Sequence, residues 1–393
     1  MVMTIEYLFS APKEDIPAGL DELSLPFKIT PSEQHPFLAL RDYFEAIRRF
    51  ILIDQEKPLV RILKERFSNE IDFNSIEKIL IRSEKHGVLY HLASVEILAD
   101  DKRTRLAVST AISEKSRAWL THEYKTLKFL NRSRKLPYLP EVYFKREVAC
   151  PPGKKKKETL SMFLGQWFEG YHEWHISVDQ KDSRQKICIW DLKEGHRYAS
   201  SEEAFEIFKQ ISKILTLYYD TIDFNQIYPW HHAAGDFIVK SGDRGIDVKL
   251  TTAREYQSIM DYFLKDAVNP MIALIYFFLN LSVKVRLDKL DGVEKMVWAG
   301  DFSVRAAVEG FFEALVEMER AGTYHLGKAE DLFALLKTFG REEIERLFQP
   351  LLDLYRKGDP EDYQTLRPNL ESHVSQLYLV LQGVHLAGFP WGY

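Results

Sequence analysis

The chain has 393 residues, with 53 Lys and Arg against 58 Asp and Glu and a net charge of −5. A hydrophobic content of 46% is typical of a folded globular protein and excludes a disordered or collagen-like chain. The mildly acidic balance provides no electrostatic footprint for nucleic acid, so we expect no nucleic-acid partner.

The sequence has few features that indicate a cellular compartment or a membrane. Two cysteines, Cys150 and Cys188, cannot build a disulfide framework, which favours a reducing compartment. The first ten residues lack the basic region of a signal peptide and carry Glu6 within a short apolar run. The longest apolar stretch, residues 271–283, is interrupted by Asn280 and predicts a buried helix rather than a membrane span. We therefore expect a cytoplasmic protein with no membrane partner.

Residues 1–75 are predicted to form an N-terminal helical extension. Residues 1–30 have the composition of an irregular arm punctuated by prolines. A second segment is amphipathic with helical period, because its apolar residues recur three and four positions apart at Phe37, Leu40, Phe44, Ile47 and Ile51. Pro58 suits the first turn of a following helix that ends near Phe67.

Residues 76–170 predict a small lobe rich in β-structure. Strands are expected over 76–82, 88–98 and 105–112, where β-branched and apolar residues are bounded by turn residues. A helix follows over 114–131 with Ser113 as its N-cap. A hairpin is then expected from strands over 141–150 and 159–168, beside the strand that holds Val108 in one antiparallel sheet.

Residues 171–393 predict a large, mostly helical lobe. A short strand over 187–190, a helix over 201–219 and a compact loop with a hairpin over 224–252 precede a segment that is nearly all helix. Helix ends are expected at Gly322, Gly340 and Gly358, and helix starts at Pro270 and Pro360. A small mixed lobe followed by a helical lobe is an α+β chain.

Five short stretches occur along the chain in an order that a known family shares. They are a glycine, Gly87, closing the first hairpin, then HEYKTLKFL over 122–130, FLGQWFEGY over 163–171, WHHAAGDFIV over 230–239 and IDVKLTT over 246–252. In this order the chain resembles the bilobal protein-kinase-like fold, in its aminoglycoside phosphotransferase and choline kinase branch. The resemblance spans residues 76–320, and each motif alone is short enough to occur by chance.

The resemblance implies a nucleotide site with ATP and Mg²⁺ as cofactors. Gly87 falls where the family covers phosphates with a glycine-rich loop, and Glu123 falls on the glutamate of the following helix. Residues 163–171 are similar to the hinge between the lobes. The expected cofactor-binding residues are therefore Gly87, Glu123, Trp167, Glu169 and Tyr171, the aromatic ones by stacking on a flat ring.

Several groups that the family's phosphotransfer needs are substituted. The third strand has Ser109 or Thr110 near the position of the phosphate-binding lysine. If Asp236 is placed on the metal-binding asparagine, His231 falls on the catalytic aspartate, and a histidine is able to act as a general base. Thr252 then falls on the second metal-binding aspartate, and a shifted register brings Asp247 there instead. The candidates are thus His231 and Asp236 for catalysis and Asp236, Thr252 and Asp247 for a metal.

The first hypothesis is a degenerate, pseudokinase-type protein that binds a nucleotide, a small molecule or a partner in the cleft between the lobes, without ordinary phosphotransfer. The alternative is an active, atypical small-molecule phosphotransferase that uses His231 and Asp236. A further alternative is a helical interaction scaffold, with a homo-oligomer as one form of it. A transition-metal site of His231, His232 and Asp236 is also considered, although adjacent histidines in extended backbone point in opposite directions.

Overall fold

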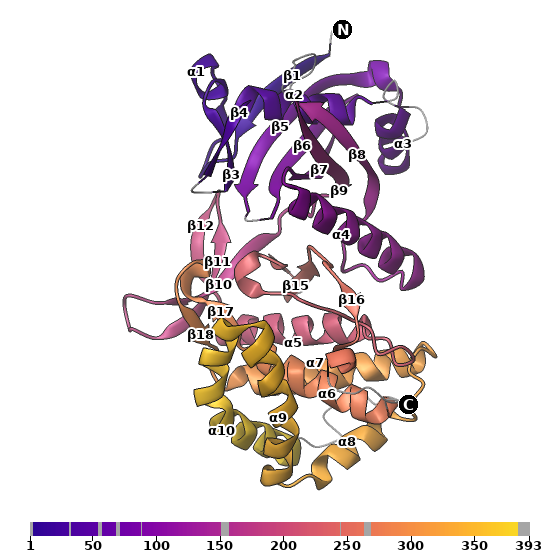
Figure 1. Cartoon of the computed structure of the whole chain (residues 1–393), viewed down its shortest axis with the longest axis vertical. Helices are drawn as coiled ribbons and strands as arrows, with labels where there is room; N and C mark the ends of the chain where they lie inside the picture. The colour runs from indigo at the N-terminus through magenta and orange to yellow at the C-terminus, as the bar shows by residue number, and fades with distance from the viewer. Residues whose placement is uncertain are drawn as a thin grey trace. The chain divides into compact units, whose positions relative to one another are not determined.

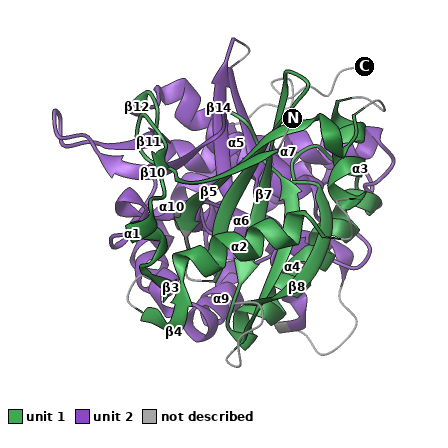
Figure 2. Cartoon of the chain, turned by 90° about the horizontal axis from the view of Figure 1, so that it is seen from above, with its two compact units in different colours: residues 1–169, 192–195 green, residues 170–191, 196–393 purple. Residues whose placement is uncertain are grey.

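The computed structural model describes residues 3–30, 33–53, 57–67, 71–87, 89–150, 157–243, 245–262 and 269–383. The chain divides into two compact units, which Figure 2 distinguishes by colour. Unit 1 contains residues 1–169 and 192–195, and unit 2 contains residues 170–191 and 196–393. Within the described ranges no helix is both long and apolar enough to cross a membrane.

Unit 1 is built on a seven-stranded sheet with the strand order β2-β1-β5-β6-β7-β9-β8 (Figure 1). From β5 onward, adjacent strands of this sheet pair antiparallel. Val108 of β7 lies opposite Leu164 of β9, which is one strand of the expected hairpin. The predicted strands and their antiparallel arrangement are therefore confirmed. The bounds are β5 (Ile76–His86), β6 (His91–Ala99), β7 (Lys102–Ala111), β8 (Val142–Cys150) and β9 (Glu158–Gln166).

Helix α4 (Glu114–Ser133) separates β7 from β8 along the chain. It begins where the sequence predicts, because the Ser113 hydroxyl accepts a hydrogen bond of 3.1 Å from the backbone N–H of Ser116 and so caps the first turn. Leu120, Leu127 and Leu130 form its buried stripe. The order strand, strand, strand, helix, strand, strand thus holds in the structure.

The first 75 residues contain more strand than the predicted helical extension. Helices α2 (Leu40–Ile51) and α3 (Lys57–Arg66) are present as expected. The prediction of an irregular arm is wrong for β1 (Thr4–Phe9), which pairs parallel to β5, because its apolar and polar residues alternate as in a half-buried strand. The other elements there are β2 (Ile16–Pro17), α1 (Leu20–Leu23), β3 (Pro26–Thr30), β4 (Glu33–Ala39) and the short 3₁₀ turn η1 (Phe73–Ser75).

The core of unit 1 lies between these N-terminal helices and the sheet. Phe44, Ile47 and Phe50 of α2 are fully buried and belong to one cluster with Ile79 of β5 and Met162 of β9. An apolar stripe of helical period therefore meets strand residues that alternate with period two, and the hydrophobic effect joins the extension to the sheet.

Unit 2 opens with a five-stranded sheet of order β12-β11-β10-β14-β15. The sequence predicts β11 and the hairpin of β14 and β15, but it does not predict β10, which begins directly after the hinge-like segment over 163–171. The bounds are β10 (His172–Val178), β11 (Gln185–Asp191), β12 (Gly195–Tyr198), β13 (Gln226–Ile227), β14 (Phe237–Gly242), β15 (Gly245–Leu250) and β16 (Tyr256–Gln257).

Helices make up most of the remainder of unit 2. As predicted, α6 begins at Pro270, α9 ends at Gly358 and α10 begins at Pro360, and α7 ends two residues before Gly322. Gly340 is expected to end a helix, but it is the N-cap residue of α9, because α8 ends at Thr338. The helices are α5 (Ser201–Leu217), α6 (Pro270–Lys284), α7 (Phe302–Arg320), α8 (Ala329–Thr338), α9 (Arg341–Gly358) and α10 (Pro360–Gly383). Shorter pieces are η2 (His232–Ala234), η3 (Ile259–Tyr262), β17 (Leu287–Lys289), η4 (Leu290–Gly292) and β18 (Met296–Trp298).

Two features fix the helical core around the candidate site. Helix α7 crosses α5 at Gly310, where an added Cβ atom would lie 2.0 Å from the backbone oxygen of Lys209, so this crossing requires a glycine. Helix α6 is apolar over almost all its length, and its Phe277 and Phe278 rings contact Tyr219 and Phe311 at 4.4 and 4.6 Å between centroids. The predicted buried helix over 271–283 is confirmed.

Candidate functional site

The segment between β13 and β14 carries the residues that the sequence singles out for catalysis. His231 is the N-cap residue of η2, and Gly235 ends that turn with a φ of 70°. A side chain at Gly235 would also meet the Glu173 carboxylate, at 2.7 Å from its Oε1 atom. The positive φ favours glycine here, whereas the Glu173 carboxylate is the end of a flexible side chain that is able to move. The resulting tight turn brings Asp236 back beside His231.

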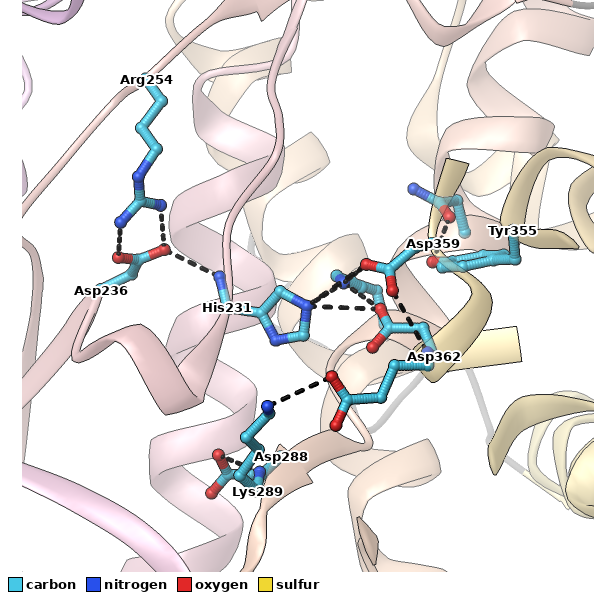
Figure 3. Close-up of polar contacts among 11 residues, drawn as sticks. His231, Asp236, Arg254, Asp288, Lys289, Tyr355, Asp359 and Asp362 are labelled. Atoms are coloured by element: carbon cyan, nitrogen blue, oxygen red, sulfur yellow. Dashed lines mark hydrogen bonds and ion pairs between the residues drawn. The ribbon is translucent and has the colours of Figure 1, made fainter. Parts of the chain in front are cut away.

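Asp236 is buried and its carboxylate is fully engaged inside the protein (Figure 3). The Arg254 guanidinium donates two hydrogen bonds of 2.6 Å, one to each carboxylate oxygen. The backbone N–H of His231 donates a third, of 2.8 Å, to Oδ2. A bidentate arginine pair is among the strongest and most directional polar contacts in proteins. Both oxygens of the Asp236 carboxylate are thus bound by a cation of the protein itself, Arg254.

The His231 side chain points away from Asp236 and into a second polar cluster (Figure 3). Its Nε2 atom lies 3.4 Å from Oδ2 of Asp362 and 3.6 Å from Oδ2 of Asp359. The Lys284 ammonium lies 2.8 Å from the same Nε2 atom, contacts Oδ2 of Asp362 and is 4.0 Å from Oδ2 of Asp359. One histidine, two carboxylates and one lysine therefore meet around a single point within unit 2. We call these four residues the His231 cluster.

The elements that supply the His231 cluster explain its geometry. Lys284 is the last residue of α6 and is 2% exposed at the end of an apolar helix. Asp359 lies between α9 and α10, and its Oδ1 atom accepts a hydrogen bond of 3.2 Å from the backbone N–H of Asp362. Asp362 lies in the first turn of α10, where the helix dipole favours an acidic side chain.

Protonation of His231 decides which partner it holds. Its Nε2 atom accepts from Lys284 when it carries no proton, and donates to Asp362 or Asp359 when it carries one. Burial and the Lys284 ammonium lower the pKa of His231, but the two carboxylates outweigh them and the pKa is raised above its usual value. Burial raises the pKa of Asp362, while His231 and Lys284 together bring it down to about 2. The charged forms of both side chains are therefore favoured.

The neighbouring His232 has a structural role. Its ring lies among the rings of Trp174, Phe208, Trp230 and Phe237, and its Nε2 atom is 3.0 Å from the backbone oxygen of Val285. Burial lowers its pKa to about 4, so the ring is neutral near pH 7. The two histidines point in different directions, as expected for adjacent residues, and His232 takes no part in the His231 cluster.

The predicted metal residues lie on or beside the β14–β15 hairpin. Asp247 lies on β15 opposite Lys240, with its side chain half exposed, and it accepts a hydrogen bond from the Tyr171 hydroxyl. Thr252 is buried just after β15. Within the described ranges, the three histidine or acidic side chains that come close enough together for one ion are His231, Asp359 and Asp362.

The predicted cofactor residues in unit 1 are placed by the sheet and α4. The backbone N–H of Gly87 donates a hydrogen bond of 2.9 Å to the oxygen of Tyr90, which closes the β5–β6 turn. Glu123 is buried on α4. Trp167 follows β9, and the guanidinium of Arg105 lies 4.3 Å from the centre of its ring. Glu169 is exposed at the end of this segment.

Arg105 is the cation that lies beside Trp167. It lies on β7, is paired with Glu84 of β5 and covers one face of Trp167. Stacking of a ligand ring on that face would displace Arg105. In unit 2, Tyr171 is held by Asp247, and burial together with this hydrogen bond raises the pKa of Tyr171.

Sequence reasoning missed Arg254, Lys284, Asp359 and Asp362. The sequence contains one indication of Lys284. This residue directly follows the longest apolar run of the chain, which predicts a buried helix, and it would be buried with that helix. Asp359 and Asp362 flank Pro360 and have the pattern of helix-start residues, which hides any other role. Arg254 lies in a loop without periodicity, and nothing in its local sequence indicates its partner.

Comparisons with known proteins give little further information. No protein-family model matches the chain, and no curated protein matches it. Among solved structures, a match is found with the crystal structure of Rad53 1-466 in complex with AMP-PNP, at 13% sequence identity and a TM-score of 0.33. The match covers 71% of this chain and 66% of that one, so the chain spans slightly less than two thirds of its length. Any functional proposal therefore rests on the geometry of this chain alone.

Proposed function

We propose that the chain is a kinase-like protein of degenerate type, which binds a nucleotide without carrying out ordinary Mg²⁺-dependent phosphotransfer. The kinase-like assignment is supported by the element order of unit 1 and by the position of the loop over 230–236 before the β14–β15 hairpin. The observation that carries the functional part is the closed carboxylate of Asp236, whose two oxygens are both held by Arg254.

The contact between Arg254 and Asp236 competes with the binding of Mg²⁺, on which ordinary phosphotransfer depends. In that reaction carboxylate and amide oxygens hold Mg²⁺ against the phosphates. Mg²⁺ requires free oxygen ligands in near-octahedral geometry, and a guanidinium that already occupies both oxygens of Asp236 competes directly with it. Asp247 already accepts a hydrogen bond from the Tyr171 hydroxyl, and Thr252 offers a hydroxyl where the reaction would need a carboxylate. A nucleotide bound by this chain would therefore be bound without a strong contribution from the metal.

The test is calorimetric titration of the purified chain with ATP, with and without Mg²⁺ or Mn²⁺. We expect binding whose dissociation constant changes less than about threefold when the metal is removed with a chelator, since the metal contributes little. A dissociation constant that falls tenfold or more on adding metal would contradict the proposal. Absence of heat at millimolar ATP, confirmed by an unchanged melting temperature, would exclude nucleotide binding altogether.

A second candidate is an active phosphotransferase of atypical type, favoured by the setting of His231. Its side chain is one-quarter exposed, and the carboxylates of Asp359 and Asp362 lie behind it. A carboxylate behind an imidazole orients the ring and stabilises its protonated form, which is the arrangement of a general base. The raised pKa of His231 places more of the ring in the protonated form near neutrality, so base catalysis would increase with pH.

Turnover measurements separate the two candidates. ADP release from ATP in the presence of small hydroxyl-bearing acceptors would be followed from pH 6 to 9, with His231→Gln as the test variant and His172→Gln as the control. His172 is also a partly exposed histidine beside a carboxylate, at 3.4 Å from Asp191, but it lies outside the His231 cluster. Activity that rises with pH and is lost only in His231→Gln would establish the second candidate.

A further inference from the structure

We propose that His231, Asp359 and Asp362 form a cation site in which the Lys284 ammonium is the resident cation, and that a divalent transition-metal ion binds there when the ammonium is removed. The inference does not depend on the degenerate kinase-like function proposed first, and it stands whether or not the chain binds a nucleotide. His231, Asp359 and Asp362 are also the residues of the second candidate function. It assigns Lys284 the role that a metal ion has in other proteins, which is to hold converging acidic and imidazole ligands together.

Two of the three distances between the ligand atoms already match those of a coordination sphere. Nε2 of His231 lies 3.4 Å from Oδ2 of Asp362 and 3.6 Å from Oδ2 of Asp359, and all three atoms lie within 4.8 Å of one another. In a tetrahedral site with metal–ligand bonds of roughly 2.0–2.2 Å, neighbouring ligand atoms are about 3.3–3.6 Å apart. The two edges that meet at Nε2 therefore need almost no adjustment around an ion.

The position of Lys284 shows where a cation lies relative to these ligand atoms. Its Nζ atom contacts the same three atoms, at 2.8 Å from Nε2 of His231, in direct contact with Oδ2 of Asp362 and at 4.0 Å from Oδ2 of Asp359. A positive charge thus already lies where these ligand atoms converge. Lys284 and Asp362 are 2% and 1% exposed, so neither charge is stabilised by bulk water.

The charges of the ligands match a divalent ion. Two carboxylates supply a charge of −2, which a divalent ion bound by them and by a neutral imidazole would neutralise in full. Imidazole with two carboxylates is a donor set that suits Zn²⁺, Co²⁺ or Mn²⁺ better than Mg²⁺, which prefers oxygen ligands and several bound waters. Asp359 is about one-third exposed, which leaves an open side for a water ligand.

The surroundings are fixed enough to keep the ligands in place without the lysine. Asp359 is held by the start of α10, where the backbone N–H groups of Asp362 and Tyr363 donate to its side chain and its backbone oxygen at 3.2 and 3.0 Å. The backbone of His231 is fixed by its hydrogen bond to Asp236. Loss of the Lys284 ammonium therefore leaves three preorganised ligands rather than a collapsed space.

The experiment is a Co²⁺ titration of the full chain with Lys284→Met, followed by visible absorption and by calorimetry. We expect one Co²⁺ per chain, with the d–d bands of a four- or five-coordinate ion, and an affinity at least 100-fold higher than for the unchanged chain. Lys289→Met is the matched control. It removes a lysine charge five residues away, where Lys289 pairs with Glu361 at 3.1 Å, and it should leave Co²⁺ binding unchanged.

Second substitutions identify the ligands. Binding gained in Lys284→Met should fall at least 30-fold when His231→Gln or Asp362→Asn is added, because each removes one ligand. If Lys284→Met folds but binds no Co²⁺, or binds it equally well after both second substitutions, the proposal is wrong.

If Lys284→Met folds poorly, refolding with the metal still tests the proposal. Lys284→Met and Lys284→Ala would be refolded with and without Co²⁺. Recovery of a cooperative thermal transition with the metal alone would support the proposal, since an ion that binds the folded state stabilises it. If both variants fail to fold equally with and without the ion, a metal does not replace the ammonium and the proposal fails.

Discussion

Two buried aspartates of unit 2 each meet an internal cation, and they do so in different ways. Asp236 receives two parallel hydrogen bonds from Arg254, one on each oxygen. Asp362 shares the single ammonium of Lys284 with His231 and with Asp359. His231 connects the two pairs, since its backbone N–H binds Asp236 while its ring faces Asp362.

The difference lies in the geometry of the two cations. A guanidinium presents a rigid planar fork that matches a carboxylate and binds both of its oxygens at once. An ammonium is a compact point charge with three donors that several acceptors are able to share. The Asp236 pair is thus a one-to-one contact, whereas in the His231 cluster one charge is shared among three acceptors.

The largest expected effect is that of Lys284→Met on stability. The substitution keeps the apolar stem but leaves Asp362 buried beside Asp359 without its ammonium. Removing one partner of a buried ion pair costs about 3–5 kcal/mol. Urea denaturation at pH 7 should show a loss of this size. Adding Asp362→Asn to Lys284→Met should recover part of it, and a loss that is unchanged in the double variant would contradict the pairing.

A smaller effect is expected for Arg254→Met. Asp236 keeps the hydrogen bond from the His231 backbone but loses both bonds to the guanidinium, and Arg254 is 17% exposed, so water compensates in part. We expect a loss of roughly 2–3 kcal/mol, below the range for fully buried pairs. Arg254→Lys should recover only part of this because it supplies a point charge without the fork. Full recovery by lysine in urea denaturation would show that charge alone matters.

The Asp362 carboxylate should make a defined contribution to acid stability. Its folded pKa is about 2, below the usual value of 3.8, so its contribution is fully present above about pH 4 and is lost as the pH falls toward 2. A shift of this size is worth about 2 kcal/mol. Acid unfolding of the unchanged chain and of Asp362→Asn should therefore converge between pH 4 and 2. Parallel curves across this range would mean that Asp362 titrates normally in the folded state.

Local sequence predicts the small sheet well and the site poorly, for one physical reason. The strands from β5 to β9 and the cap of α4 follow from periodicity and from Ser113, both of which act within a few residues. Strand β1 pairs with β5 more than seventy positions along the chain, and nearby prolines obscure its alternation. Pairing across such a distance leaves little trace in either segment.

The candidate site shows the same limit. His231 and Asp236 are five residues apart, and the motif around them is enough to identify both. Lys284 lies 53 positions after His231, and Asp362 lies 78 positions after Lys284. A lysine at the end of an apolar helix requires a buried acidic partner, but the sequence does not say which of 58 acidic residues provides it.

The smallest expected effect is that of Lys289→Met. It tests whether the burial of an ion pair, rather than its charge alone, determines how much stability is lost when the pair is broken. Lys289 pairs with Glu361 at 3.1 Å, and both side chains are substantially exposed, at 32% and 54%. Exposed ion pairs contribute about 0–1 kcal/mol and are screened by salt. Urea denaturation should show a loss of less than about 1 kcal/mol that disappears in high salt, whereas the loss in Lys284→Met should persist there. If both losses vanish in salt, the Lys284 ammonium is reached by solvent ions, and the His231 cluster is then an open surface network rather than a buried cation site.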